Sequence, residues 1–250
     1  MRRALIALVL AAAAASIPGA AAGRGIALSA SPLRVTLRGA SAAAITVRNP
    51  GRRPLLVDVS RSGFARSLHG EPRVRPARGP GWLRLRPKRI RLLAGAKAVL
   101  YVRAAPRRHT APGDHPALVL LTTRPLGVKH VRVRLRVGVI VNLRVRGRIV
   151  RHLDAHALAV RRSGVRRLLE LRLVNRGNVT EHLGGDGLRL SLSRDGRRFA
   201  TLRPRSDELL PHSAGVVVFP YGGRVRGTVV ARVELRAPVH GSRRAFHLRL

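Results

Sequence analysis

The sequence predicts an all-β protein with two tandem immunoglobulin-like β-sandwiches that follow an N-terminal signal peptide. Three observations lead to this prediction. Apolar residues alternate with polar ones along most of the chain, and a period of two residues is that of a β-strand. Turns containing Gly and Pro separate these segments at the short spacing typical of sandwiches. The order of strands and turns in the first half returns in the second half.

The first 22 residues have the order of a secretory signal peptide. Arg2 and Arg3 precede an apolar run from Ala4 to Ala15, and small residues follow up to Ala22. This charged, apolar, small order favours cleavage after Ala22. The apolar run is short for a membrane anchor, which needs about 20 residues. We therefore expect an exported chain that is periplasmic, cell-wall associated or extracellular. The chain has no cysteine, which excludes a lipoprotein anchor and disulfides.

The first sandwich is expected within residues 23–147. Seven segments with strand periodicity are predicted at residues 31–39, 43–51, 54–62, 82–87, 89–104, 115–124 and 131–145. Turn residues separate several of them, as in the Asn-Pro-Gly at residues 49–51 and the Pro-Gly-Asp at residues 112–114. This number of strands in about 120 residues is that of an immunoglobulin-like sandwich.

The second sandwich is expected within residues 148–250, because the pattern of the first half restarts there. "LLELRLVNRGNV" (residues 168–179) repeats the strand, Asn and Gly of "AAITVRNPGRRP". "ELLPHSAGVVVFPY" (residues 208–221) repeats the Leu-Leu, turn and strand of "RLLAGAKAVLYVRA". "RGTVVARVELRA" similarly matches "GDHPALVLLTTR", and "RRAFHLRL" forms the last strand. We interpret the chain as a duplicated sandwich.

The segment Val131–Gly147 alternates most strictly, with apolar residues at every odd position up to Val145. Five of its even positions are arginine: Arg132, Arg134, Arg136, Arg144 and Arg146. Side chains two residues apart share a face of a strand about 6.7 Å apart. Guanidinium groups suit phosphate and carboxylate. These arginines are therefore predicted to bind a polyanion, with a solvated outer face as the alternative. Ile140 makes the middle of this strand apolar on both faces, so we expect the second sandwich to cover it, with a peptide-binding groove as the alternative.

The net charge of +39 comes from 50 Lys and Arg against 11 Asp and Glu, in a chain that is 45% hydrophobic. Almost all the cations are arginine, whose codons are GC-rich, so part of the charge is attributed to genome composition. Aromatic residues make up only 3% of the chain, which disfavours single-stranded nucleic acid as a partner because bases stack on aromatic rings. Export also separates the chain from genomic DNA.

Catalytic and metal sites are not predicted. No G-x-S-x-G, H-E-x-x-H or phosphate-loop motif occurs, so we expect a protein that is not an enzyme and has no cofactor. His152, Asp154 and His156 lie at i, i+2 and i+4, and such nitrogen and oxygen ligands could begin a zinc or manganese site. Because no fourth ligand is evident, this cluster is only a weak metal candidate.

The segments "SPLRVTL", "VRNPGRRPLLVDV", "WLRLRPKRIRLLAGAKAVLYVRA" and "PGDHPALVLLTT" resemble the immunoglobulin-like domains of periplasmic pilus chaperones. They are also similar to related bacterial surface sandwiches, including the peptidoglycan-binding domain of WxL-type proteins. The resemblance covers residues 28–146, with a weaker echo in "LVNRGNVTE". It implies that two basic residues in the interdomain cleft anchor a subunit's C-terminal carboxylate. Arg34 matches the first and is the candidate cleft anchor, whereas Ile140 occupies the second position.

Two functions follow as expectations. The main one is an exported, non-enzymatic envelope protein that binds or scaffolds at the cell surface through its basic surface. Its partner would be an anionic cell-wall polymer, lipid headgroups or a surface protein. The alternative is a chaperone or assembly factor for surface subunits that acts through an exposed strand edge. Ionic adhesion should weaken steeply with salt, whereas strand addition should survive it because main-chain hydrogen bonds carry the affinity.

Overall fold

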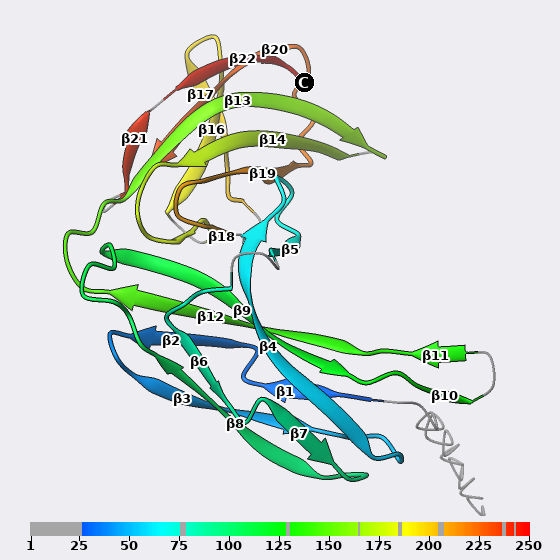
Figure 1. Ribbon diagram of the computed structural model, residues 1–250. Coiled ribbons are helices and arrows are strands. Elements are labelled where there is room, and N and C mark those ends of the chain that lie inside the picture. The colour runs from blue at the N-terminus through cyan, green and yellow to red at the C-terminus, as the bar shows by residue number, and fades with distance from the viewer. Residues whose placement is uncertain are drawn as a thin grey trace, which may run out of the picture.

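The computed structural model describes residues 27–250 except 76–78, 129–130, 165, 185–186, 205–207, 237–238 and 243. All regular elements of the described residues are β-strands, arranged in two β-sandwiches (Figure 1). The predicted fold class is therefore correct. The predicted signal peptide lies outside the described residues. No helix among the described residues is long and apolar enough to span a membrane.

The first sandwich contains β1 to β12. One sheet has the order β1-β3-β8-β6 and consists of β1 (Ser29–Ser31), β3 (Ala42–Arg48), β8 (Lys97–Ala104) and β6 (Leu83–Arg86). The other has the order β2-β12-β9-β4-β5 and consists of β2 (Arg34–Arg38), β12 (Arg136–Val145), β9 (Gly113–Thr123), β4 (Leu55–Arg66) and β5 (Pro72–Arg75), with β7 (Arg89–Leu92) also paired to β4. A separate hairpin joins β10 (Leu126–Val128) and β11 (Val131–Val133).

The second sandwich contains β13 to β22. Its sheets have the orders β19-β14-β13-β21 and β17-β16-β20-β22, and β15 pairs with β18. The bounds are β13 (His152–Ser163), β14 (Arg166–Asn175), β15 (Glu181–His182), β16 (Leu188–Arg194), β17 (Arg197–Leu202), β18 (Glu208–Leu209), β19 (Ser213–Tyr221), β20 (Thr228–Leu235), β21 (His240–Ser242) and β22 (Ala245–Arg249). The chain passes from β12 to β13 through residues 146–151, which include the predicted boundary at residue 147.

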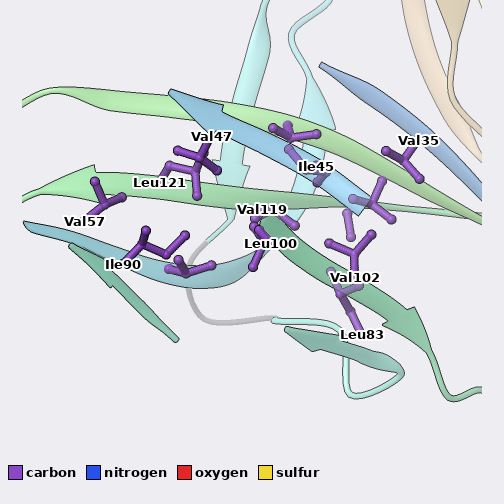
Figure 2. Packing of buried hydrophobic residues seen from close by; sticks show 14 of the residues in the cluster. Val35, Ile45, Val47, Val57, Leu83, Ile90, Leu100, Val102, Val119 and Leu121 are labelled. Atoms are coloured by element: carbon purple, nitrogen blue, oxygen red, sulfur yellow. The ribbon is translucent and has the colours of Figure 1, made fainter. Parts of the chain in front are cut away.

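Alternation along the strands builds both cores. In the first sandwich, branched aliphatic side chains from the two sheets meet face to face, and Ile45, Leu100 and Val119 are fully buried (Figure 2). The second core is built in the same way around Phe219, which is also fully buried. Branched aliphatic residues suit strands because their side chains pack on a pleated surface. Aliphatic side chains therefore fill both cores with few aromatic rings.

A buried asparagine forms the same hydrogen bonds in each sandwich. Asn49 Nδ2 lies 2.8, 3.3 and 3.0 Å from the carbonyl oxygens of Arg53, Leu92 and Leu93. Its Oδ1 accepts the N–H of Gly51.

Asn175 Nδ2 likewise lies 2.8, 3.1 and 3.1 Å from the carbonyl oxygens of Val179, Leu209 and Leu210. Its Oδ1 accepts the N–H of Gly177. Both asparagines are 0% exposed. The acceptors include the Leu-Leu pairs that the sequence repeat aligns, so the two halves share an internal tie as well as a strand pattern.

The first predicted strand, residues 31–39, is divided between two sheets. Ser31 of β1 pairs with Thr46 of β3, whereas Arg34 of β2 pairs in parallel with Ile140 of β12. The chain thus crosses from one sheet to the other at Pro32 and Leu33. Beyond this crossing, β2 lies beside only the second half of β12.

The predicted continuous strand at residues 131–145 was wrong in one respect, because it is broken between Val133 and Arg136. Val133 pairs with Leu126, and Arg136 pairs with Thr122. The intervening segments contain three residues on one side and two on the other, so one residue is extra. The hydroxyl of Thr123 accepts the N–H of Leu135 in place of a carbonyl, and Pro125 has no N–H to donate. The ladder therefore breaks at a bulge.

Candidate functional site between the two sandwiches

An apolar cluster joins the two sandwiches. It contains Phe64 of β4, Leu118 and Leu120 of β9, and Leu210 of the second sandwich, with Ile140 of β12 packed against it. Odd-numbered residues of β12 face the core of the first sandwich, so the even-numbered Ile140 faces outward. The second sandwich covers the middle of this strand, as the sequence predicted.

Beside this cluster, a carboxylate of the second sandwich lies among three cationic or titratable side chains. Glu208 of β18 is 2.8 Å from Nη1 of Arg34, 3.6 Å from Nη1 of Arg66 and 3.1 Å from Nδ1 of His182. The Glu208 side chain is only 16% exposed, so salt screens these pairs less than pairs on an open surface. Arg34, the candidate cleft anchor, therefore already has a carboxylate partner within its own chain.

A second carboxylate, Asp114 of β9, connects the sandwiches from the other side. Its Oδ2 accepts hydrogen bonds from Nη2 of Arg144 and from the backbone N–H of Thr180, each at 2.8 Å. Arg144 Nε also donates to Oδ1. Burial by itself would raise the pKa of Asp114, but these bonds and one from Asn142 hold it below its ordinary value of 3.8. These bonds favour the ionised form of Asp114 and connect it to Thr180 of the second sandwich.

The pKa of Glu181, which follows Thr180 in the chain, is shifted in the opposite direction. Its Oε2 accepts a 2.9 Å hydrogen bond from Nη1 of Arg151, but its Oε1 is buried with no hydrogen-bond partner in the described structure. Burial raises the pKa of Glu181 above its ordinary value of 4.5, the nearby Asp114 adds to this, and Arg151 opposes it. Two buried carboxyls in one junction are therefore shifted in opposite directions.

The Asn178 side chain connects the two sandwiches through hydrogen bonds to backbone groups. Its side-chain amide donates to the carbonyl oxygens of Pro112 and Arg148 at 3.0 and 2.9 Å, and its Oδ1 accepts the N–H of Val150. Gly113 has a φ of +117°, and a Cβ there would lie 2.1 Å from the carbonyl oxygen of Asn178. Only glycine fits this approach. The Pro-Gly-Asp turn predicted from the sequence is thus also a contact between sandwiches.

A cavity of about 120 Å³ lies in this junction. Arg34, Arg144 and His182 line it together with Asn142 and Ile140. Arg34 and Ile140 are opposite each other in the register of β2 and β12. The two positions that the resemblance assigns to a carboxylate anchor are thus adjacent, but only one of them holds a cation. The space suits a small polar group or a few water molecules.

The structure does not form one row from the five arginines of the predicted polyanion stripe. The side chain of Arg132 lies outside the described residues, and Arg134 lies in the break between β11 and β12. Arg136 and Arg146 are exposed, whereas Arg144 turns toward the second sandwich and binds Asp114. Polyanion binding by this stripe stays a prediction.

Only two of the three residues of the weak metal candidate contact each other. His152 Nε2 is 3.0 Å from Asp154 Oδ1, and Arg176 also binds this carboxylate. A register shift in β13 between Ala155 and Ala157 places His156 at a bulge, so the strand alternation on which the prediction rested does not hold. The described residues contain no group of three or more potential ligands that could hold a metal ion.

No family model and no curated protein matches the sequence. Solved structures do match over nearly the whole chain. The class 5 fimbriae chaperone CfaA aligns with a TM-score of 0.52 and 10% identity, over 89% of this chain and 98% of that chain. A structure from work on the chaperone-tip adhesin complex of CFA/I fimbriae aligns with a TM-score of 0.51, at the same identity and coverage. The fold is that of fimbrial chaperones.

The fimbrial-chaperone fold supports one part of the resemblance found in the sequence, and the WxL-type part stays an expectation from sequence alone. Sequence reasoning found Arg34 and Ile140 but missed Asp114, Glu181 and Glu208. The signals were faint. Asp114 was expected only as a residue of the Pro-Gly-Asp turn, and neither Glu181 nor Glu208 belongs to a charge or ligand motif.

Proposed function

We propose that this protein is an exported chaperone or assembly factor that binds surface subunits through an open strand edge and acts in the periplasm. The match to fimbrial chaperones over both sandwiches supports this proposal. One of those structures is described as a chaperone-tip adhesin complex, so the fold can hold a surface subunit. The proposed activity is binding, with no chemical step.

The open edge of β12 is the observation that carries the proposal. β2 pairs with residues 140–144 of β12 and with none of residues 136–139. The N–H of Ile140 points toward β2, since it donates to the carbonyl oxygen of Leu33 at 2.9 Å. Backbone groups of alternate residues point to the same side of a strand, so those of Gly138 and Arg136 also face this side. None of the described strands pairs with them there. They can accept an added strand.

Apolar side chains accompany this edge. Val133 is 39% exposed and Leu33 is 58% exposed, and both flank the unpaired segment. Leu135 and Val137 are half-buried. An added strand offers main-chain hydrogen bonds for affinity and alternate side chains for specificity. The described edge offers both unpaired backbone groups and apolar side chains.

The residues beside this edge indicate which contacts would hold the partner: an ionic anchor or main-chain hydrogen bonds. Glu208 already neutralises Arg34, and Ile140 replaces the second cation that the resemblance implies. A partner's terminal carboxylate would have to compete with Glu208. Main-chain pairing along β12 therefore supplies most of the affinity, and binding should tolerate salt.

Gly138 offers a direct test with a matched control. Gly138→Pro removes an N–H that faces the open side and leaves the pairing with β9 in place, since proline is tolerated at strand edges. Gly138→Ala keeps this N–H, and its Cβ would lie 3.7 Å from Cδ2 of Leu118, an ordinary contact. Each variant of the secreted chain is used to capture exported proteins from its own host, and the captured partner is then titrated. Binding should persist with Gly138→Ala and fall at least about tenfold with Gly138→Pro.

Salt provides the second arm of this test. Binding should change little between about 50 and 200 mM salt, whereas ionic adhesion through several phosphate-like contacts would fall by orders of magnitude. A partner that dissociates from the unmodified chain over this range, or that tolerates Gly138→Pro, would show that the edge does not hold it.

A further inference from the structure

The outer face of the sheet β1-β3-β8-β6 carries only positive charge. Five exposed cations lie on it: Arg48, Arg84, Arg86, Lys97 and Arg103. The four strands contain no acidic residue. β3 and β8 lie on the side of the first sandwich away from the second sandwich (Figure 1). This face is therefore separate from the open edge of β12 and does not depend on the proposed function.

Two arginines on this face stand directly opposite each other. Arg84 of β6 pairs in register with Arg103 of β8, and Arg86 pairs with Tyr101. Directly opposite side chains have Cβ atoms about 5 Å apart, and like charges at that distance destabilise a sheet. Neither Arg84, Arg86 nor Arg103 forms an ion pair with any described residue. An anion placed between them would remove this repulsion.

Tyr101 lies at the centre of this group and is 60% exposed. The other six aromatic side chains of the protein are buried or half-buried: Phe64, Trp82, Phe199, Phe219, Tyr221 and Phe246. The neighbouring strand β3 presents only Ala44 opposite Tyr101 and Ala42 opposite Arg103. Small side chains therefore leave one face of the ring open beside the arginines.

Two hollows flank the edge strand β6, and Arg84 and Arg86 line both. One, of about 530 Å³, lies over Ala42, Tyr101 and Arg103. The other, of about 520 Å³, lies on the far side of β6 and adds Arg61 and Lys88. Arg84 and Arg86 thus form a wall shared by the two hollows, and an anion in either hollow can reach these guanidinium groups.

We propose that this basic face binds an acidic polysaccharide, with carboxylates or other anionic groups on the arginines and a sugar ring against Tyr101. Arginine forks bind planar carboxylates in bidentate geometry. A lone aromatic ring on a flat sheet suits one sugar ring. Single-stranded nucleic acid is instead bound by successive aromatic platforms, which this face lacks. Its exposed apolar side chains are few, so insertion into a lipid surface has little to drive it.

Polygalacturonate, which carries one carboxylate on every ring, is the probe for this site. Its binding to the full secreted chain is measured by titration at about 50 mM salt, where ionic contacts are strong. The triple variant Arg84→Ser, Arg86→Ser, Arg103→Ser should bind about tenfold or more weakly. The matched control Arg162→Ser, Arg166→Ser, Arg172→Ser removes the same charge from exposed arginines of the second sandwich. It should weaken binding less than about threefold.

Variants of Tyr101 distinguish the contribution of ring contact to binding from that of charge. Tyr101→Phe keeps the ring and should bind as the unmodified chain does, whereas Tyr101→Ser should weaken binding about fivefold or more. Equal loss in the two triple variants would overturn the proposal, because bulk charge would then explain binding. Tighter binding to oligothymidylate or to anionic lipid vesicles than to polygalacturonate would overturn the choice of ligand, as would equal binding to neutral dextran.

Discussion

Two asparagine side chains replace the devices that commonly tie a sandwich together. Asn49 and Asn175 are each fully buried and connect a turn to the Leu-Leu segment about 40 residues further along. The chain has no cysteine for an inter-sheet disulfide, and only 3% of its residues are aromatic. A buried amide that satisfies three carbonyl oxygens does this work instead, provided that both of its donors and its acceptor stay paired.

Replacing these asparagines should destabilise the protein strongly. We expect Asn49→Ala or Asn175→Ala to lower the free energy of unfolding by about 2–4 kcal/mol, because several buried carbonyl oxygens lose their donor. Urea unfolding followed by circular dichroism measures this.

Asn175→Asp is the informative companion to this measurement. It keeps the acceptor for Gly177 but faces the carbonyl oxygens with a carboxylate, so it should cost at least as much as alanine. An aspartate variant within about 0.5 kcal/mol of the unmodified protein would contradict the role of the amide donors.

Sequence reasoning at this scale recognised both asparagines, but only as turn residues. The motifs Asn-Pro-Gly and Asn-Arg-Gly indicate a change of chain direction. They do not show that the side chain points inward, because that depends on a distant Leu-Leu segment. The repeat of both features in the two halves was the available signal.

At the scale of elements, β12 shows what alternation can and cannot predict. The odd positions from Val139 to Leu143 are buried as expected, and Ile140 meets the second sandwich. The break before Arg136 was missed because it depends on an extra residue in the opposite strand. Likewise, the crossing of the first strand at Pro32 was missed because its two halves pair with strands of different sheets. Local alternation does not specify these distant partners.

Thr123 should control how firmly the hairpin β10–β11 continues from β9 and β12. Its side chain is nearly fully buried, and its hydroxyl accepts the N–H of Leu135 at 2.9 Å. Thr123→Val leaves this N–H unpaired and should lower the free energy of unfolding by about 1–3 kcal/mol. Amide hydrogen exchange at Leu135 should become faster.

The neighbouring Thr122→Val is the control for this prediction. Thr122 pairs with Arg136 through the backbone and is less buried, so its hydroxyl has no comparable task. If both valine variants accelerate exchange at Leu135 equally, the hydroxyl does not hold the break in place.

At the scale of the whole molecule, two carboxylates bridge the sandwiches, and a third lies beside one of them. Asp114 binds Arg144 and Thr180, Glu181 lies beside them, and Glu208 lies against Arg34 and Arg66. The sequence predicted that two sandwiches touch at Ile140. It could not bring together acidic residues that lie 27–94 positions apart and that local patterns assign to turns and short strands.

The two shifted carboxyls should contribute to the free energy of unfolding with opposite dependences on pH. The pKa of Asp114 is lowered, so its contribution to stability is present above pH 3.8 and is lost as the pH falls through its lowered pKa. The pKa of Glu181 is raised, so its contribution is present below pH 4.5 and is lost as the pH rises through its raised pKa.

Variants that do not titrate should remove these losses separately. Asp114→Asn should lose less stability than the unmodified protein when the pH falls from 3.8 to about 2. Glu181→Gln should lose less when the pH rises from 4.5 to about 7. Urea midpoints across this range measure both slopes. Profiles that stay parallel to that of the unmodified protein would show that neither group is shifted.

The crossing of β1 and β2 also has a mechanical consequence. β2 runs parallel to β12 over five residue pairs, Arg34↔Ile140 to Arg38↔Arg144. The chain enters β2 at one end of this overlap and leaves β12, toward the second sandwich, at the other. Tension between the N-terminal end and the second sandwich therefore pulls the two strands along their length in opposite directions. Such shear loads all the bonds of the overlap at once, whereas peeling would break them one by one. The overlap acts as a clamp under pulling force.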